Sequence, residues 1–288
     1  MMKIPSILKT VFLLSFLLTT LLPQNADAQL PRERAVQDRE VNDVFWATTN
    51  VGISTVKNLS ANNLNSSVAH IFGLVDGGID RFYGLDDGAN TRLGLDYGIN
   101  DRLSLGIGRM TFNKLVDIRG KYNILRQTVT GSMPIDVAGK VSVGISTVSG
   151  IGLEFSDRVS YFTSIMLARK FNRLSVQLSP MMAHFNTTSG ANPSQLFGLG
   201  ILSNYELTDR LALSAEYLPV LGERNQESSD ALAIALNIDT GGHVFQVFLS
   251  SSQWHNEQFI MANNNDRFWE GDFRFGFNIH RVFGLGRK

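Results

Sequence analysis

The chain has 288 residues, of which 26 are Lys or Arg and 26 are Asp or Glu, so its formal net charge is zero. This balance argues against a nucleic-acid-binding protein, which carries a basic excess. The absence of cysteine excludes disulfide scaffolds, thiolate metal sites and thiol catalysis. Charged residues make up 18% and hydrophobic residues 43% of the chain, a composition that excludes long disordered regions.

The N-terminus has the pattern of a secretory signal peptide. Lys3 and Lys9 form a positive region before an apolar run over residues 11–22, and Ala26-Asp27-Ala28 matches the small-residue signal for cleavage. Residues 1–28 are therefore predicted to be a signal peptide that exports the protein. An uncleaved membrane anchor is the alternative, because such apolar runs and short anchors overlap in length.

Residues 29–63 follow without a clear period. Leu30–Glu40 is rich in charge, while Val44–Ile53 has the composition of a short strand or of a segment that folds into a lumen. We expect residues 29–63 to form an N-terminal extension that lies in the periplasm or inside the barrel predicted by the rest of the chain.

From residue 64 onward the hydrophobic period is two. Over 92–99 the odd positions are apolar and the even positions are polar or glycine, and 115–126 and 273–280 alternate in the same manner. Because successive side chains of a strand point to opposite faces, each segment has one apolar and one polar face. About twelve such segments, with the length that a tilted membrane strand requires, are expected near residues 65–73, 90–98, 103–112, 115–126, 138–149, 159–169, 173–184, 195–206, 210–220, 230–238, 243–252 and 268–283.

Asn and Asp mark the connections between these segments. Quartets with Asp-Arg at their centre have the composition of hairpin turns and lie at Asn100–Leu103, Ser156–Val159, Thr208–Leu211 and Asn265–Phe268. Longer polar stretches lie at 187–194, 222–230 and 253–265. Short turns that alternate with longer loops are typical of the two rims of an outer-membrane barrel, one periplasmic and one external.

The predicted fold of residues 64–288 is thus all-β, an antiparallel transmembrane β-barrel of about twelve strands. Alternation alone also fits a water-soluble sandwich, in which apolar faces pack against each other. Low charge and an aromatic last strand favour the barrel, whose apolar faces contact lipid. That strand resembles the C-terminal signal read by barrel-assembly machinery, although Gly284–Lys288 follow Phe283, where the signal normally ends.

Several short motifs, densest between His70 and Gln127, resemble a known family. They are His70-Ile71-Phe72-Gly73, Arg81-Phe82-Tyr83-Gly84-Leu85-Asp86-Asp87, Arg92-Leu93-Gly94-Leu95-Asp96-Tyr97-Gly98-Ile99, Asp101-Arg102-Leu103, Gly106-Ile107-Gly108-Arg109, Lys121-Tyr122 and Leu125-Arg126-Gln127. Over roughly residues 42–283 the chain is similar to the family named domain of unknown function 5777, β-barrel proteins of Gram-negative bacteria. Ile71 departs from the pattern, in which a basic residue is expected. The resemblance implies an outer-membrane barrel and assigns no chemistry to any residue.

Charged residues on the polar faces are the candidate functional residues. The predicted lumen lining contains Arg92, Asp96, Asp117, Arg119, Lys121, Lys140, Glu216 and Arg274. In a narrow barrel these groups can pair and fill the interior, or they can leave water and form a constriction that filters small polar solutes. The sequence favours pairing with some remaining water, and the leading function is passage or binding of a small polar solute.

Two other classes of function have less support. A structural or interaction protein would bind a partner through the external loops at 187–194 and 253–265. A barrel-embedded hydrolase would need a nucleophile beside a base, for which His70 or His184 with a nearby serine are the candidates.

The remaining motifs do not indicate a chemical site. The histidines lack metal-ligand spacing, and Asp86–Asn90 lacks the order of residues in a calcium loop. We therefore expect no enzyme activity, no metal and no cofactor, with outer-membrane lipid as the surrounding partner. The sequence does not define an oligomeric state.

Overall fold

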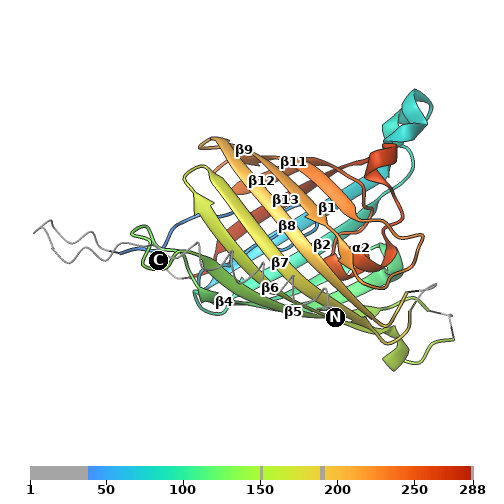
Figure 1. Cartoon of the computed structure of the whole chain (residues 1–288), viewed down its shortest axis with the longest axis horizontal. Helices are drawn as coiled ribbons and strands as arrows, with labels where there is room; N and C mark the ends of the chain where they lie inside the picture. Colours follow the sequence, from blue (N-terminus) through green and yellow to red (C-terminus); the bar gives the residue numbers. More distant parts are fainter. Residues whose placement is uncertain (1–37, 150–151, 189–191, 287–288) are drawn as a thin grey trace, which may run out of the picture. The chain divides into compact units, whose positions relative to one another are not determined.

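A computed structural model describes residues 38–149, 152–188 and 192–286 of the chain. The predicted signal peptide and the first part of the N-terminal extension lie outside these residues. The described chain consists mainly of long β-strands joined by turns and short helices (Figure 1).

The strands are β1 (Asn63–Leu74), β2 (Asn90–Gly98), β3 (Leu103–Met110), β4 (Leu115–Leu125), β5 (Asp136–Ser146), β6 (Val159–Phe171), β7 (Leu174–Phe185), β8 (Gln195–Thr208), β9 (Leu211–Leu218), β10 (Val220–Leu221), β11 (Ala231–Asp239), β12 (His243–Ser250) and β13 (Arg274–Gly284). The helical elements are η1 (Val75–Gly84), η2 (Phe112–Lys114), η3 (Ser156–Arg158), α2 (Glu257–Asn263) and η4 (Phe268–Glu270). No helix within the described ranges is both long and apolar enough to cross a bilayer.

The strands form one closed antiparallel sheet. Neighbours in sequence pair with each other, and β1 pairs with β13, so the first and last strands meet. β9 and β10 both pair with β8 and are separated only by Pro219, which has no N–H for a ladder hydrogen bond. Counted as one strand, they reduce the thirteen segments of the sheet to twelve. The predicted twelve-stranded antiparallel barrel is confirmed.

The last strand begins later than alternation predicted. It was expected over 268–283, and that start was wrong, because Phe268–Glu270 forms a turn of 3-10 helix instead. Gly271, with φ 90°, ends this turn in the left-handed region that glycine adopts readily. The Arg267 N–H donates to the Asp272 carboxylate at 2.8 Å and closes the loop.

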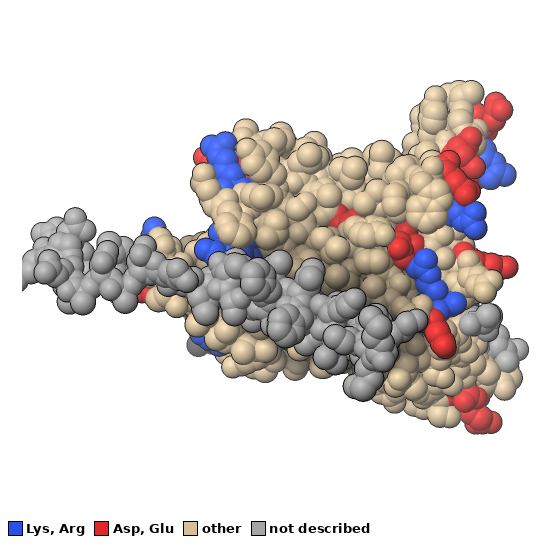
Figure 2. Space-filling model, viewed as in Figure 1, with Lys and Arg blue, Asp and Glu red and all other residues tan. Residues whose placement is uncertain are grey.

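The outward faces of the strands form an apolar belt. Leu93, Ile107 and Val141, in the middle of β2, β3 and β5, are 56%, 50% and 61% exposed. Figure 2 shows most of the visible charged side chains toward the two ends of the barrel, with uncharged residues on the wall between them. Exposed apolar side chains along a closed sheet are typical of a surface that contacts lipid.

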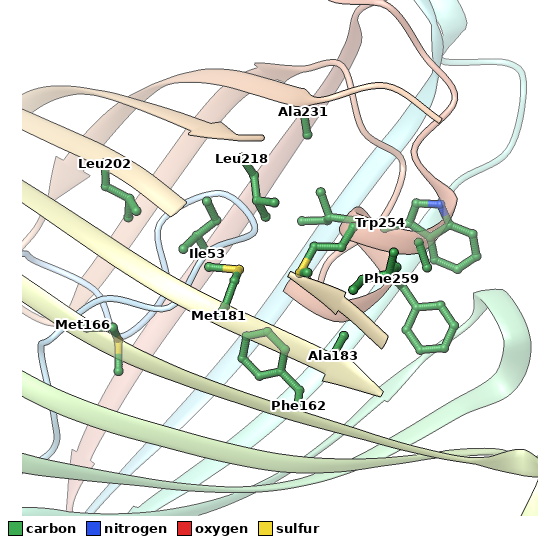
Figure 3. Close-up of a cluster of buried hydrophobic side chains, with 14 of the residues drawn as sticks. Ile53, Phe162, Met166, Met181, Ala183, Leu202, Leu218, Ala231, Trp254 and Phe259 are labelled. Atoms are coloured by element: carbon green, nitrogen blue, oxygen red, sulfur yellow. The ribbon is translucent and has the colours of Figure 1, made fainter. Parts of the chain in front are cut away.

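Two segments that are not part of the β-sheet wall fill the interior of the barrel. We call residues 44–56 the plug segment and residues 251–264, which carry α2, the inserted loop; nearly all of both are buried. Their apolar side chains, including Ile53, Trp254 and Phe259, meet the inward-facing Met181 and Leu218 in one cluster (Figure 3). The lumen is therefore packed with protein.

The belt gives a testable prediction. Val141→Arg places a guanidinium in hydrocarbon and should lower the free energy of unfolding by about 2–4 kcal/mol, measured by urea unfolding in lipid vesicles. The matched control is Val129→Arg, at a 53% exposed valine in the turn between β4 and β5, which should change stability by less than about 0.5 kcal/mol. Equal effects of the two substitutions would show that the outer face is not a lipid-facing belt.

Candidate functional site

Four charged side chains form a network on one side of the lumen. Arg92 on β2 lies 2.7 Å from the Asp117 carboxylate on β4, and Arg119 on β4 bridges Asp117 and Asp96, also at 2.7 Å each. None of these side chains is more than 14% exposed. The inward-facing positions of β3 beside the network are glycines, where a Cβ would collide with Asp96 and Arg92. The glycines of β3 therefore make room for the network.

Two lysines hold the inserted segments against the wall. The Lys121 ammonium on β4 donates to two carbonyl oxygens of the plug segment at 3.3 and 3.2 Å. The Lys140 ammonium on β5 pairs with Glu257 of the inserted loop at 2.8 Å and donates to the Ser54 hydroxyl at 2.7 Å. Lys140 thus joins the wall, the plug segment and the inserted loop.

The Glu216 carboxylate on β9 fixes one turn of the plug segment. Its oxygens accept hydrogen bonds from the backbone N–H groups of Val51, Gly52 and Ile53 at 3.1, 2.8 and 3.3 Å. The Asn50 amide donates to the same carboxylate at 3.3 Å. Four N–H donors thus converge on one buried side chain, so Glu216 is a principal anchor of the plug segment.

Arg274 differs from the other seven predicted lumen residues. Its Nε donates to the Asp266 carboxylate at 2.7 Å and its Nη1 to the Phe72 carbonyl oxygen at 3.5 Å. These contacts lie where β13 begins, at the rim. The structure brings the other seven residues to the interior around the two inserts and leaves Arg274 apart from them.

Residues 253–265 were expected to form an external loop, and this expectation was wrong for residues 253–264, which belong to the inserted loop. Trp254, Phe259 and Met261 are at most 8% exposed, and removing these apolar side chains from water favours the inward position of the loop. Its polar side chains also find partners inside, since Gln258 donates to the Ser160 hydroxyl at 3.0 Å. The apolar residues 259–262 were the signal in the sequence that could have indicated this.

The lumen wall is also less polar than the sequence indicated. The inward-facing Phe162, Met166, Met181, Leu202 and Leu218, on β6 to β9, are at most 5% exposed. The charged residues predicted as lining are concentrated on β2, β4 and β5, with Glu216 on β9. The lumen therefore has one charged side, and an apolar cluster among uncharged polar residues forms what we call its apolar side.

Little space remains between the inserts and the wall. A cavity of about 20 Å³ lies beside Asp96, Lys121 and Lys140, which is enough for about one water molecule. Hollows of about 390 and 600 Å³ lie at the end with the short turns and at the end with the longer loops. The lumen is closed between these two hollows.

His255 of the inserted loop is buried without a charged partner. Its Nε2 donates to the Asn90 carbonyl oxygen at 2.8 Å, and its Nδ1 has no partner among the described residues. Burial lowers the pKa of His255 from its usual 6.5 to about 4, because removal from water disfavours the charged ring. Within the described parts of the chain, no group of three or more His, Asp or Glu side chains is placed to hold a metal ion.

The fold and the interior define the class of the protein, a membrane β-barrel whose lumen holds two inserts. A family model described as a membrane bound beta barrel domain (DUF5777) matches residues 45–283. The chain belongs to this family, which confirms the resemblance seen in the sequence. The family and the apolar belt locate the protein in the outer membrane, surrounded by lipid.

Solved structures of outer-membrane proteins are similar to the chain at low sequence identity. The chain is similar to the COG4313 outer membrane channel from Pseudomonas putida F1, with a TM-score of 0.52 and 13% identity over 79% of this chain and 98% of that chain. It is also similar to the NanC porin, with a TM-score of 0.49 and 10% identity over 78% of this chain and 100% of that chain. The comparison with curated proteins gave no match.

The charge network leads to a prediction about stability. Arg119→Met leaves Asp96 and Asp117 without a shared partner, and removal of one member of a buried ion pair costs about 3–5 kcal/mol. Urea unfolding in vesicles should show this loss. The control is Arg267→Met, whose pair with Glu270 has side chains 46% and 53% exposed and should contribute less than about 1 kcal/mol. A loss of that small size for Arg119→Met would show that the network does not support the fold.

The burial of His255 gives a pH prediction. The folded-state pKa of about 4 lies below the unfolded value of 6.5, so the unfolded chain binds the proton more tightly. Its contribution to the free energy of unfolding is therefore full above about pH 6.5 and is lost as the pH falls toward 4, by up to about 3 kcal/mol. His255→Gln should remove this part of the pH dependence in urea unfolding between pH 4 and 8. Parallel profiles for the variant and the wild type would contradict the assignment.

Proposed function

We propose that the protein passes a small polar solute across the outer membrane through its lumen, and that the plug segment leaves the lumen when this happens. The observation that carries the proposal is the attachment of the plug segment. Wall side chains such as Glu216, Lys121 and Gln177 hold it by hydrogen bonds to its backbone, and none of its described residues pairs with a strand of the barrel. The plug segment can therefore leave while every strand pair of the wall stays intact.

The two hollows and the charged wall support this proposal. A hollow on each side of the closed region, of about 390 and 600 Å³, gives a small solute room to approach from either side. Without the plug segment, Arg92, Asp96, Asp117, Arg119, Lys121 and Lys140 would face water. Fixed charges of both signs in a narrow passage filter solutes by charge and size.

We also propose that barrel-assembly machinery recognises β13. This strand closes the sheet by pairing with β1 from Asn63↔Gly284 to Leu74↔Arg274, so it is the last strand needed for a complete wall. Its phenylalanines at 275, 277 and 283 give it the aromatic character of such a signal.

A structural or interaction protein is the second candidate. On η1, Ile79, Phe82 and Tyr83 are 70%, 52% and 53% exposed, and Figure 1 shows this element beyond the rim of the barrel. Phe82 and Tyr83 have φ values of 45° and 55°, a strained region for such residues. Apolar side chains held outward on a loop suit a protein partner. Of the predicted external loop at 187–194, residues 189–191 lie outside the described chain.

The proposal does not include catalysis. His70 Nδ1 lies 2.8 Å from the Thr91 hydroxyl, and the ring stacks on Phe277. The Nδ1 of His184 has no hydrogen-bond partner among the described residues. These contacts give no support to the pairing of either histidine with a serine nucleophile.

Conductance across a planar bilayer tests the channel. Glu216→Gln replaces one acceptor oxygen by an amide that cannot accept the plug N–H groups. Because an unmet buried N–H group costs about 1–3 kcal/mol, the plug segment should leave more readily. We expect rare conductance steps from the purified wild-type protein and an open fraction at least about tenfold higher in the variant. Gln177→Leu, which removes another acceptor for the plug segment, should act in the same direction.

Cysteine labelling shows whether the plug segment has moved. Because the chain contains no cysteine, Ala47→Cys reports the plug segment and Ser60→Cys is an exposed control in the same stretch. Labelling at position 47 by a maleimide should accelerate in the Glu216→Gln background, while position 60 reacts quickly in both. Faster mobility of the unheated protein on a detergent gel verifies the folded barrel. Accelerated labelling without any conductance would rule out passage and favour the interaction role.

A further inference from the structure

The two sides of the lumen meet at one side chain. The charged residues of β2, β4 and β5 lie on one side, and apolar residues such as Met181, Leu196 and Leu218, each at most 5% exposed, lie on the other. The Lys140 ammonium lies 5.2 Å from the centre of the Phe162 ring, which belongs to the apolar side, and 2.8 Å from the Glu257 carboxylate. A cation therefore stands at the border of an apolar surface.

The inserted loop shows which chemistry fits this border. At the start of α2, the Glu257 carboxylate pairs with Lys140 and accepts the Ser54 N–H at 2.9 Å. The residues that follow turn to the apolar side, where the Phe259 and Phe185 rings have centroids 5.5 Å apart in an edge-on contact. At this border α2 thus presents a carboxylate, with the apolar side chains of Phe259 and Met261 close to it in the chain.

Glycines of β8 provide space for the apolar part of this occupant. A Cβ at Gly198 would lie 3.1 Å from the Met261 methyl group and 3.3 Å from Leu218, and a Cβ at Gly200 would lie 2.9 Å from Met181 and 3.2 Å from Ile53. Larger residues at either position would compete with these side chains. Because Gly198 and Gly200 have no side chains, departure of the two inserts would expose an apolar hollow in the wall at these positions.

We infer that the solute accepted by the lumen is an apolar carboxylate. Its carboxylate pairs with Lys140 in place of Glu257, and its ring or alkyl group occupies the hollow beside Gly198 in place of Met261. The inference rests on the proposed function, in which the plug segment leaves the lumen, and it adds that the inserted loop leaves as well. It narrows the class of solute to one that is polar at a single end. A fully polar solute would leave the apolar side in contact with water, which is unfavourable.

Binding of 4-phenylbutyrate tests the ligand class, with butyrate as the probe that lacks the ring. The protein used is the full mature chain with Glu257→Gln, which removes the competing carboxylate, and binding is measured by isothermal titration calorimetry. We expect 4-phenylbutyrate to bind at least about tenfold more tightly than butyrate, from burial of the ring. It should also bind about tenfold more tightly to this variant than to the wild type.

Further variants test where each end of the probe binds, the carboxylate at Lys140 and the ring at the hollow beside Gly198. Adding Lys140→Gln should weaken both probes by at least about tenfold, while Lys140→Arg should retain binding because it keeps the charge. Gly198→Leu fills the hollow and should weaken 4-phenylbutyrate without changing butyrate, and it gives a second test if Lys140→Gln does not fold. Titration of the Gly198→Leu protein also serves as the control for partition of the probe into detergent, since the micelles are the same and the hollow is filled. Mobility of the unheated protein on a detergent gel verifies folding of each variant.

Conductance in the absence of carboxylate separates this inference from the proposed function. If the bilayer shows conductance while 4-phenylbutyrate and butyrate bind equally, the ligand class is overturned and the apolar side serves only to pack the inserts. If the tenfold preference is found and depends on Lys140 while no conductance occurs, the ligand class is supported and passage is overturned. Loss of binding in Gly198→Leu for both probes alike would also overturn the placement of the apolar group.

Discussion

Lipid offers no hydrogen-bond partner, so every backbone N–H and C=O group within the bilayer must be paired inside the protein. The β1–β13 pairing meets this requirement by joining the two ends of the sheet. Once the wall is closed and its outer face is apolar, every second residue must face the interior. Charges such as Arg92 and Asp117 are then confined to a narrow space, where they cost free energy unless they are paired. Their 2.7 Å contact is therefore a consequence of closing the wall.

The backbone N–H and C=O groups of the plug segment must also be paired, but their partners are not those of a β-sheet. The backbone of this segment is irregular, so it has no neighbouring strand, and the wall side chains supply its hydrogen bonds. The Gln177 side chain accepts from the Val56 N–H at 2.9 Å and donates to the Ser54 carbonyl oxygen at 2.8 Å, as a paired strand would. Glu216 and Lys121 act in the same way. Residues that have the character of pore lining in the sequence are therefore anchors of the plug segment in this structure.

The strands of the barrel wall could be predicted from the sequence, because the alternation of apolar and polar residues depends only on neighbouring positions. The strand predicted over 90–98 coincides with β2, and seven of the eight proposed lining residues lie in the interior. The inserts depend on contacts between distant positions, such as Ser54 with Glu257, which no local pattern contains. The apolar side of the lumen escaped detection for a related reason. On β6 to β8 the inward face mixes apolar residues such as Met166, Met181 and Leu202 with uncharged polar residues such as Gln177, so the alternation that marks a polar lumen is weak there.

The contacts of Lys140 determine the order in which the two inserts can leave the lumen. Its ammonium contacts Ser54 of the plug segment and Glu257 of the inserted loop, and the Ser54 N–H also donates to Glu257. Withdrawal of the plug segment alone removes two hydrogen bonds from this group and leaves the Lys140–Glu257 pair in place. Withdrawal of the inserted loop alone leaves Lys140 without a carboxylate, and an unpaired buried charge is costly. The plug segment should therefore leave first, and the inserted loop should follow when a solute carboxylate takes the place of Glu257. In the proposed mechanism, this order would couple withdrawal of the inserted loop to the arrival of the solute, because the solute carboxylate would replace the partner that Lys140 loses.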